Sequence, residues 1–223
     1  MASIRWFGHS GFEIIADKKI ILVDPFLTGN PKAAVKASDI TRADIVCVTH
    51  DHSHHLGDAI DICKRTGATF VGAYELGTYA QAQGVTNVVA MNIGATLEVK
   101  GIKITMVQAF HSAERGSPVG FVFDVGKARI YHAGDTGLFS DMRMIGQIYK
   151  PDIVCIPIGG YYTMGAREAA EAVRLILPKI VFPMHYLTFP MLAQSADDFV
   201  NAIKEKGLGT QVVVLKPGES YNF

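Results

Sequence analysis

Short apolar runs rich in β-branched residues, each closed by a turn, recur along the whole chain. There are eleven of them, at residues 3–7, 19–23, 44–49, 69–72, 87–90, 102–109, 120–125, 128–132, 153–157, 180–183 and 211–215. Most are too short for helices and too apolar for a sheet with one face in water, so they predict strands that are buried on both faces. Because about eleven strands would make an unusual single open sheet, we expect two sheets.

Helical periodicity appears in four stretches between these runs, at residues 56–66, 74–83, 166–177 and near 196–206. Helices interleaved with buried strands predict a layered α/β protein in which the helices cover the outside of the sheets. No repeat, low-complexity tract or flexible linker divides the sequence. Its 223 residues therefore predict a single domain over residues 1–223.

The composition excludes several classes of partner. The 21 basic residues balance the 21 acidic ones, so the chain lacks the basic excess that draws proteins onto nucleic acid. No apolar run approaches the roughly 20 residues that cross a bilayer, and residues 1–12 lack the apolar stretch of a signal peptide. Cys47, Cys63 and Cys155 are an odd number in apolar contexts, which indicates buried thiols in a reducing cytoplasm. The oligomeric state stays open, a homo-oligomer included.

The histidines are the most informative residues in the sequence. Four of the eight, His50, His52, His54 and His55, fall within six residues that directly follow an apolar run. In an extended segment residues i and i+2 project to the same side, so His50 and His52 are placed to bind one ion together. The turn into the helical stretch 56–66 brings His54 and His55 back across the strand end. Two adjoining metal positions are therefore expected.

Three further residues of metal-ligating type, His111, Asp135 and His185, each come just after an expected strand. In α/β folds this is the edge where functional loops gather. A solvated His-rich loop or a few core histidines is the alternative interpretation, and the convergence of so many donors argues against it. Imidazole and carboxylate without thiolate suit zinc, with manganese, iron or nickel as other choices.

Several motifs of this chain resemble the metallo-β-lactamase superfamily. They are FGHS at 7–10, VDPF at 23–26, THDHSHHLGD at 49–58, HAGDTGLF at 132–139, PIGGYYTMG at 157–165 and PMHY at 183–186. The closest resemblance is to the branch of small prokaryotic metal-dependent hydrolases related to ascorbate-6-phosphate lactonase. The resemblance implies a four-layer αββα sandwich with a site for two metal ions at one edge.

The resemblance also implies ligands for each ion. The first ion would be bound by His50, His52 and His111, the second by His55 and His185, with Asp135 bridging both. The superfamily pattern has Asp where this chain has His54. Either His54 ligates through a ring nitrogen and gives a second site richer in histidine, or that site is weakened and the protein works with one ion. Flavo-di-iron relatives have Glu where His52 stands, so hydrolytic chemistry is favoured over redox chemistry.

The chemistry that follows is hydrolysis by a metal-bound hydroxide, because a divalent ion lowers the pKa of bound water to about 7. The expected substrate is a small ester, lactone or phosphodiester. Asp135 would anchor the ions and also accept a proton. Asp24 is expected either to hold the outer nitrogen of a ligating imidazole or to serve only as a turn residue before Pro25. Asp58 is expected either to orient a ligand or to interact favourably with the dipole of the following helix, and the second role is preferred.

Three more residues are candidates for the site. His9 is placed near the site by the resemblance, either lining the pocket or donating a proton, or else serving as a structural histidine. Tyr162, in the Gly-rich segment 159–165, is a candidate for stabilising an oxyanion, although adjacent glycines also form tight turns. His132 is expected to have a core or outer-shell role.

Two other functions compete with a hydrolase of small molecules. The carboxylate missing at position 54 is compatible with a metal-binding or ligand-sensing protein without turnover. A nuclease like the tRNA-processing members of the superfamily is the other alternative, although those members carry an RNA-binding arm and a basic surface that this chain lacks.

Overall fold

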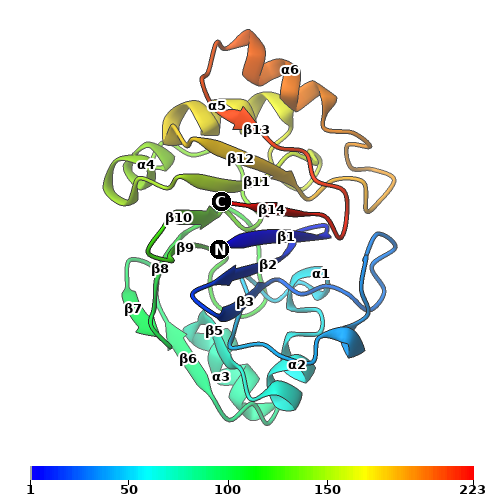
Figure 1. Cartoon of the computed structure of the whole chain (residues 1–223), viewed down its shortest axis with the longest axis vertical. Coiled ribbons are helices and arrows are strands. Elements are labelled where there is room, and N and C mark those ends of the chain that lie inside the picture. The colour runs from blue at the N-terminus through cyan, green and yellow to red at the C-terminus, as the bar shows by residue number, and fades with distance from the viewer. Residues whose placement is uncertain (1) are drawn as a thin grey trace.

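The apolar runs form two seven-stranded sheets (Figure 1). The computed structural model describes residues 2–223. The first sheet has the order β14 (Ser220–Asn222), β1 (Ser3–Gly8), β2 (Gly11–Ala16), β3 (Lys19–Val23), β4 (Ile45–Cys47), β5 (Thr69–Ala73) and β6 (Val88–Met91). The second has the order β13 (Gln211–Val212), β12 (Ile180–Met184), β11 (Ile153–Pro157), β10 (Arg129–His132), β9 (Val119–Asp124), β8 (Ile102–Gln108) and β7 (Thr96–Val99). The expectation of two sheets is confirmed.

Each sheet has an antiparallel half and a parallel half. Strands β14, β1, β2 and β3 pair antiparallel, and β3 to β6 pair parallel. Likewise β7 to β10 pair antiparallel, and β10 to β13 pair parallel. Parallel neighbours need crossover connections, which the helices supply.

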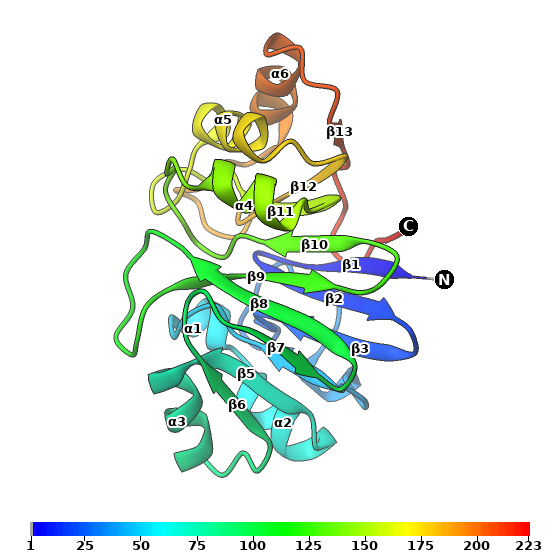
Figure 2. The ribbon, with the colours of Figure 1, turned by 90° about the vertical axis from the view of Figure 1, so that its left-hand side faces the viewer.

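The helices lie in two groups. Those of the first sheet are α1 (Ser53–Leu56), α2 (Ala59–Thr66) and α3 (Tyr74–Ala82), and those of the second are α4 (Met142–Tyr149), α5 (Ala166–Ile176) and α6 (Asp197–Glu205). Figures 1 and 2 show the two groups at opposite ends of the molecule with both sheets between them. This is the expected four-layer αββα sandwich of the α/β class.

The main core joins the two sheets. Phe12 and Ile14 of the first sheet belong to one buried cluster with Phe121 and Phe123 of the second, and removal of this apolar surface from water is the dominant favourable term in folding. The three cysteines are free and buried, as predicted. None of the helices formed by residues 2–223 has the length and apolar character that spanning a membrane requires.

The sequence prediction missed or misplaced several elements. It omitted β2, β7, β14, α4 and a short 3₁₀ helix at Ala37–Asp39. It also began the helix over 56–66 three residues before α2 and did not predict α1. The two helices separate at Gly57, where φ is +43° and a Cβ atom would lie 2.6 Å from the carbonyl oxygen of Pro25. Only glycine fits this close approach, and the turn it makes ends α1.

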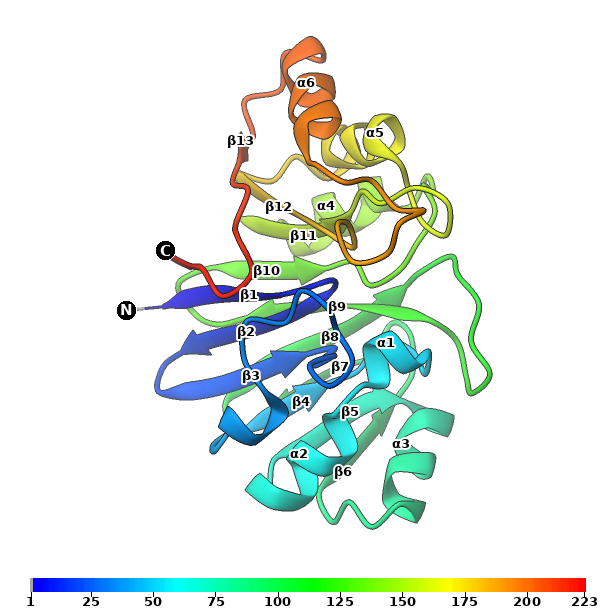
Figure 3. The same ribbon diagram turned by 90° about the vertical axis from the view of Figure 1, so that its right-hand side faces the viewer.

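The topology gathers the candidate site residues at one edge. Strands β1, β3 and β4 run in one direction within their sheet, and β8, β10, β11 and β12 do so within theirs. The loops after their carboxyl ends project from the side of the molecule away from the chain termini (Figure 3). We call this edge the rim, and it carries His9, Asp24, the segment 50–55, His111, Asp135 and His185.

Candidate metal centre

The segment after β4 sets two imidazole nitrogens against each other. His50 Nε2 lies 3.0 Å from His52 Nδ1, as expected for residues i and i+2 of an extended segment. His111, after β8, adds a third ring, and one nitrogen from each of the three lies within 4.8 Å of the others. His50 is buried, whereas His52 and His111 are partly exposed. These residues form the first donor group.

A second donor group lies beside the first. The single turn of α1 carries His54 and His55 back toward the strand ends, where they meet His9 from the β1–β2 turn and His185 from the end of β12. One nitrogen from each of these four rings lies within 4.8 Å of the others. The structure therefore brings His54 into the second group, at the position where the superfamily pattern has Asp.

Asp135 stands between the two groups. Its Oδ2 is 2.9 Å from His185 Nε2, 3.1 Å from His55 Nε2 and 3.6 Å from His111 Nε2. The residue is 1% exposed, and neither carboxylate oxygen has a partner with hydrogen-bond geometry, nor do the Nε2 atoms of His55 and His185. Buried polar atoms without partners are costly. Their convergence on one region is what a cation site requires.

Contact between Asp135 and His55 shifts the pKa of each residue toward its charged form. Burial raises the pKa of Asp135, but His55 and His185 outweigh burial and hold that pKa well below its usual range. Burial lowers the pKa of His55, but Asp135 and Asp24 together raise it to about 10. The metal-free chain therefore holds a proton on His55 between two carboxylates, and a cation that binds there must displace this proton.

Three other imidazoles of the rim have a lowered pKa and are neutral near pH 7, which is the form that binds metal. Burial lowers the pKa of His50 well below its usual range, and lowers that of His54 to about 3. Burial also lowers the pKa of His111. Of the four rings of His50, His54, His55 and His111, only that of His55 is positively charged at neutral pH and repels an approaching cation.

Asp24 connects the first and second donor groups through hydrogen bonds. Its Oδ2 accepts hydrogen bonds from His55 Nδ1 (2.7 Å) and from the hydroxyl of Thr49 (2.7 Å), and its Oδ1 accepts one from the backbone N–H of Thr49 (2.8 Å). The Thr49 hydroxyl also lies 3.0 Å from His50 Nδ1. Holding Nδ1 of His55 turns its Nε2 toward Asp135. Of the two roles expected for Asp24, the structure thus shows the contact with an imidazole.

Two residues that sequence reasoning missed fix the loop of His111. Asp51 accepts a hydrogen bond from Arg115 Nη1 (3.0 Å), and the hydroxyl oxygen of Thr136 accepts one from the backbone N–H of Phe110 (3.0 Å). The sequence did hold a signal for the role of Asp51. Successive side chains of an extended segment point to opposite sides, so Asp51 points away from His50 and His52 and toward another loop.

His132 stays outside the donor groups, in agreement with its expected core or outer-shell role. Its Nε2 donates to the carbonyl oxygen of Ser10 (2.9 Å), and its Nδ1 accepts from the backbone N–H of Gly134 (3.2 Å). Both ring nitrogens are therefore satisfied.

Tyr162 lies in a loop that abuts the second donor group. At Gly159, at the start of this loop, a Cβ atom would overlap the carbonyl oxygen of His185 at 2.0 Å. Tyr162 itself is 54% exposed, and its ring packs edge-on against Tyr161. Its role in stabilising an oxyanion stays a prediction.

Asp58 connects two loops. It precedes α2, but its side chain makes no cap on the helix. Instead its Oδ2 accepts hydrogen bonds from the backbone N–H groups of Leu27 (2.9 Å) and Thr28 (2.8 Å). The prediction of a dipole role therefore missed its main contacts, which tie the loop after β3 to the start of α2.

The donor set fits a borderline divalent cation. Seven imidazoles and one carboxylate converge, and none of the three cysteines belongs to a donor group in the part of the chain that the structure describes. Nitrogen ligands lie about 2.0–2.1 Å from zinc and hence roughly 3–3.5 Å from one another. The separation of 3.0 Å between His50 Nε2 and His52 Nδ1 fits this requirement.

The chain is similar in sequence to a family model and to several known proteins. Residues 3–185 match the family model described as a Beta-lactamase superfamily domain. The chain is 52% identical over 227 residues to the UPF0173 metal-dependent hydrolase of Methanopyrus kandleri, covering 98% of each chain. It is 47% identical over 225 residues to the UPF0173 metal-dependent hydrolase of Caldivirga maquilingensis, covering 100% of this chain and 99% of that one.

A solved structure is also similar over its full length. The metallo hydrolase from the hyperthermophilic archaeon Ignicoccus hospitalis superposes with a TM-score of 0.93 at 36% identity, covering 100% of this chain and 99% of that one. The family model, the relatives and the solved structure thus agree with one another.

Proposed function

The chain belongs to the metallo-β-lactamase superfamily, and from this premise we propose that it is a metal-dependent hydrolase of a small ester, lactone or phosphodiester. The observation that carries the proposal is the buried carboxylate of Asp135, whose Oδ2 lies within 3.6 Å of imidazole nitrogens from both donor groups. A carboxylate in this position would be available to ions held by either group. The names of the relatives, which are metal-dependent hydrolases, support the same class of reaction.

The proposal assigns three imidazoles to each ion, with zinc as the metal. His50, His52 and His111 would hold the first ion, His54, His55 and His185 would hold the second, and Asp135 would serve both. When bound, such ions lower the pKa of bound water to about 7 and polarise a substrate oxygen.

The residues of the chain supply orientation and a place for the proton. Asp24 holds His55 by its Nδ1 at 2.7 Å, so the ring stays directed at the shared region. Asp135 offers Oδ1, which has no hydrogen-bond partner, as the acceptor for a proton released during hydrolysis.

The histidine at position 54 bears on the choice of substrate. An imidazole there in place of a carboxylate leaves the centre with one more unit of positive charge. A singly anionic phosphodiester gains more from that charge than a neutral ester does. Among the three substrate classes we therefore place phosphodiesters first.

The test begins with protein stripped by a chelator and reloaded with zinc. We expect two ions per chain and turnover of bis(p-nitrophenyl) phosphate, with slower turnover of a lactone and of p-nitrophenyl acetate. His111→Ala should remove the first ion and lower turnover by more than the roughly 100-fold that an outer-shell change costs. Asp152→Asn is the control, because Asp152 lies before β11, at the end of the strands opposite to the donor groups, and pairs with Lys179 there.

Two outcomes would contradict the proposal. Zinc binding without turnover of any of the three substrates would favour a metal-binding or ligand-sensing protein. Full turnover in His111→Ala would show that the catalytic site lies elsewhere.

A further inference from the structure

His9 is a buried histidine whose ring faces the second donor group. Its ring centroid lies 4.1 Å from that of His185, 5.1 Å from that of His54 and 5.5 Å from that of His55. One of its nitrogens is within 4.8 Å of a nitrogen from each of the other three. This position alone allows three roles: a metal ligand, a proton donor or a structural histidine.

The hydrogen bonds of His9 determine which nitrogen carries its proton. The hydroxyl of Thr188 donates to the carbonyl oxygen of Tyr186 (3.2 Å) and also lies 3.0 Å from His9 Nδ1. A hydroxyl has a single hydrogen and a carbonyl oxygen only accepts, so both contacts are hydrogen bonds at once only when the ring donates in the second. In that arrangement neutral His9 carries its hydrogen on Nδ1 and a lone pair on Nε2.

That lone pair has no partner within the described residues. His9 Nε2 is buried and makes no hydrogen bond. A nitrogen with a lone pair has no proton to give to a leaving group, so this tautomer argues against the role of proton donor. A structural histidine uses both nitrogens, as His132 does. A ligand of a cation is the role that needs a free lone pair on a neutral ring.

The backbone of His9 is held in place from both sheets. Its φ of +54° lies in the left-handed region, which is strained for a residue other than glycine. Its carbonyl oxygen accepts hydrogen bonds from Trp6 Nε1 (2.9 Å) in the first sheet and from the backbone N–H of His185 (2.9 Å) after β12 in the second. Strain that is retained by such contacts is typical of functional positions.

We propose that His9 is a ligand of the second metal ion, so that four imidazoles, from His9, His54, His55 and His185, surround this position with Asp135 at its shared side. The inference rests on the metal centre proposed above and extends it. A position so rich in nitrogen favours zinc, cobalt or nickel over magnesium and manganese, which prefer oxygen ligands.

The test measures metal binding without substrate. Metal-free wild type and His9→Ala are titrated with Co²⁺ and then with Zn²⁺, following the visible absorption of cobalt and the number of bound ions after dialysis. In His9→Ala we expect the first ion to bind as in wild type, and the affinity for the second to fall by more than the roughly 10- to 100-fold that loss of an outer-shell partner costs. The cobalt spectrum of the second ion should also change.

Two matched variants separate a ligand from its surroundings. Thr188→Val removes only the hydroxyl that orients His9 and should lower the affinity for the second ion by roughly 10- to 100-fold at most. Asp152→Asn changes a residue before β11, at the end of the strands opposite to the donor groups, where Asp152 pairs with Lys179, and it should bind both ions as wild type does. If His9→Ala binds the second ion with wild-type affinity and an unchanged cobalt spectrum, His9 is not a ligand.

A measurement on the unmodified chain covers the case in which His9→Ala fails to fold. Long-range ¹H–¹⁵N spectra of protein with ¹⁵N-labelled histidine, assigned with His9→Gln, report the protonation of each ring nitrogen. We expect Nδ1 of His9 to be protonated before and after zinc, and the Nε2 resonance to move only with the second equivalent. A protonated Nε2 would overturn the inference.

These results are distinguishable from a failure of the proposed function. If two ions bind with His9 as a ligand and none of the three substrates is hydrolysed, the hydrolase proposal fails and the inference on His9 stands. If hydrolysis depends on His111 but His9→Ala keeps its second ion, the reverse holds.

Discussion

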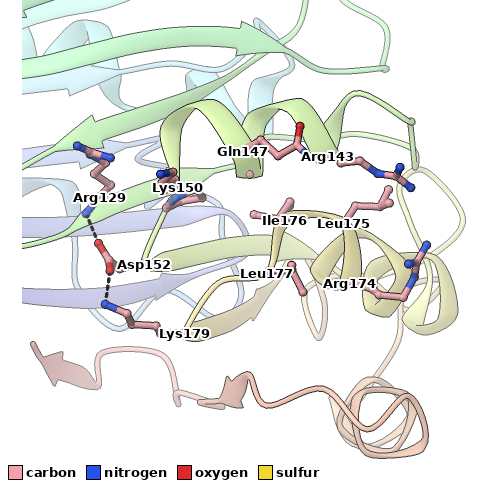
Figure 4. Close-up of a pocket in the computed structure, with 12 residues that line it drawn as sticks. Arg129, Arg143, Gln147, Lys150, Asp152, Arg174, Leu175, Ile176, Leu177 and Lys179 are labelled. Carbon is pink, nitrogen blue, oxygen red and sulfur yellow. Dashed lines mark hydrogen bonds and ion pairs between the residues drawn. The ribbon is translucent and has the colours of Figure 1, made fainter.

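The two ends of strands β10 to β12 differ in whether their polar side chains have hydrogen-bond partners. At the carboxyl ends, Asp135 and His185 are buried and their side-chain polar atoms lack hydrogen-bond partners. At the amino ends, the partly exposed Asp152 accepts hydrogen bonds from the backbone N–H of Arg129 (3.0 Å) and from Lys179 Nζ (2.7 Å) (Figure 4). Paired, solvated charges need no further explanation, whereas unpaired buried ones do.

The amino-terminal end shows that a hollow alone is a poor guide to function. A hollow of about 650 Å³ opens there between α4 and α5, and five cationic side chains line it with one carboxylate. Lys150 ends α4 and Arg174 lies in the last turn of α5, where a cation interacts favourably with the helix dipole. Arg174 also pairs with Glu171. Three of the five cations, Arg129, Arg174 and Lys179, therefore pair with carboxylates, and the rim is the better candidate for chemistry.

The largest expected effect comes from Asp135→Asn, which keeps the shape of the side chain and removes its charge. Both ions should bind more weakly, and hydrolysis should fall by on the order of 10²–10⁴-fold, because a ligand and a proton acceptor are lost together. Metal analysis and kcat/KM for bis(p-nitrophenyl) phosphate measure the two effects. Wild-type metal content in Asp135→Asn would refute the bridging role.

The second prediction concerns the pH dependence of the metal-free protein. Burial lowers the pKa of His9 and His50 well below the ordinary 6.5 and that of His54 to about 3. Below pH 6.5 the unfolded chain therefore binds protons that the folded chain does not, and the free energy of unfolding should fall by about 1.4 kcal/mol per pH unit for each such ring.

His55 should act in the opposite direction. Its folded pKa is raised to about 10, so its contribution to stability is complete below pH 6.5 and is lost as the pH rises toward 10. Urea unfolding of metal-free protein at about pH 5, 6.5 and 8.5 should therefore show a maximum near the middle value. A free energy of unfolding that does not change over this range would contradict both pKa directions.

A smaller effect is expected from Asp24→Asn. The amide keeps one acceptor but loses the charge that holds His55 at 2.7 Å, so zinc affinity should fall by roughly 10- to 100-fold. Asp58→Asn is a matched control, because Asp58 contacts only backbone N–H groups of Leu27 and Thr28. Competition with a chromophoric chelator measures both variants, and equal affinities would show that Asp24 does not tune the centre.

The smallest effect is expected at the opposite end of the strands. Asp152→Asn weakens a partly exposed pairing with Lys179, so the free energy of unfolding should fall by only about 1 kcal/mol. Metal content and turnover should stay at wild-type values, as chemical denaturation and the assays above would show. A loss of metal in this variant would mean that the two ends of the strands are coupled.

Much of the site could be predicted because its residues follow local patterns. His50, His111, Asp135 and His185 each come after an apolar run, and parallel strands bring such positions to one edge. The partners of these residues could not be predicted in the same way. Thr188 is 179 positions from His9, and no local pattern connects them.

The missed elements have similar causes. Three of the four residues of β7 are exposed, so this strand lacks the apolar run that marks the others. The helix α4 contains Gly146, which lowers helix propensity but allows close contact, since a Cβ there would lie 2.5 Å from the carbonyl oxygen of Ile176 in α5. Tertiary contacts decide such segments, and a single sequence does not display them.

The pairing of β1 with β14 makes the metal centre sensitive to the far end of the chain. Ser3 lies opposite Asn222 and Arg5 opposite Ser220, so the two termini are neighbours (Figure 1). The edge of β1, the strand that precedes His9, is thus hydrogen-bonded to residues 220–222. Trimming or tagging the C-terminus would weaken this strand pairing, and the position of His9 would be disturbed first. A circular permutant in which the two termini are joined and the chain is opened at a distant turn should keep the pairing.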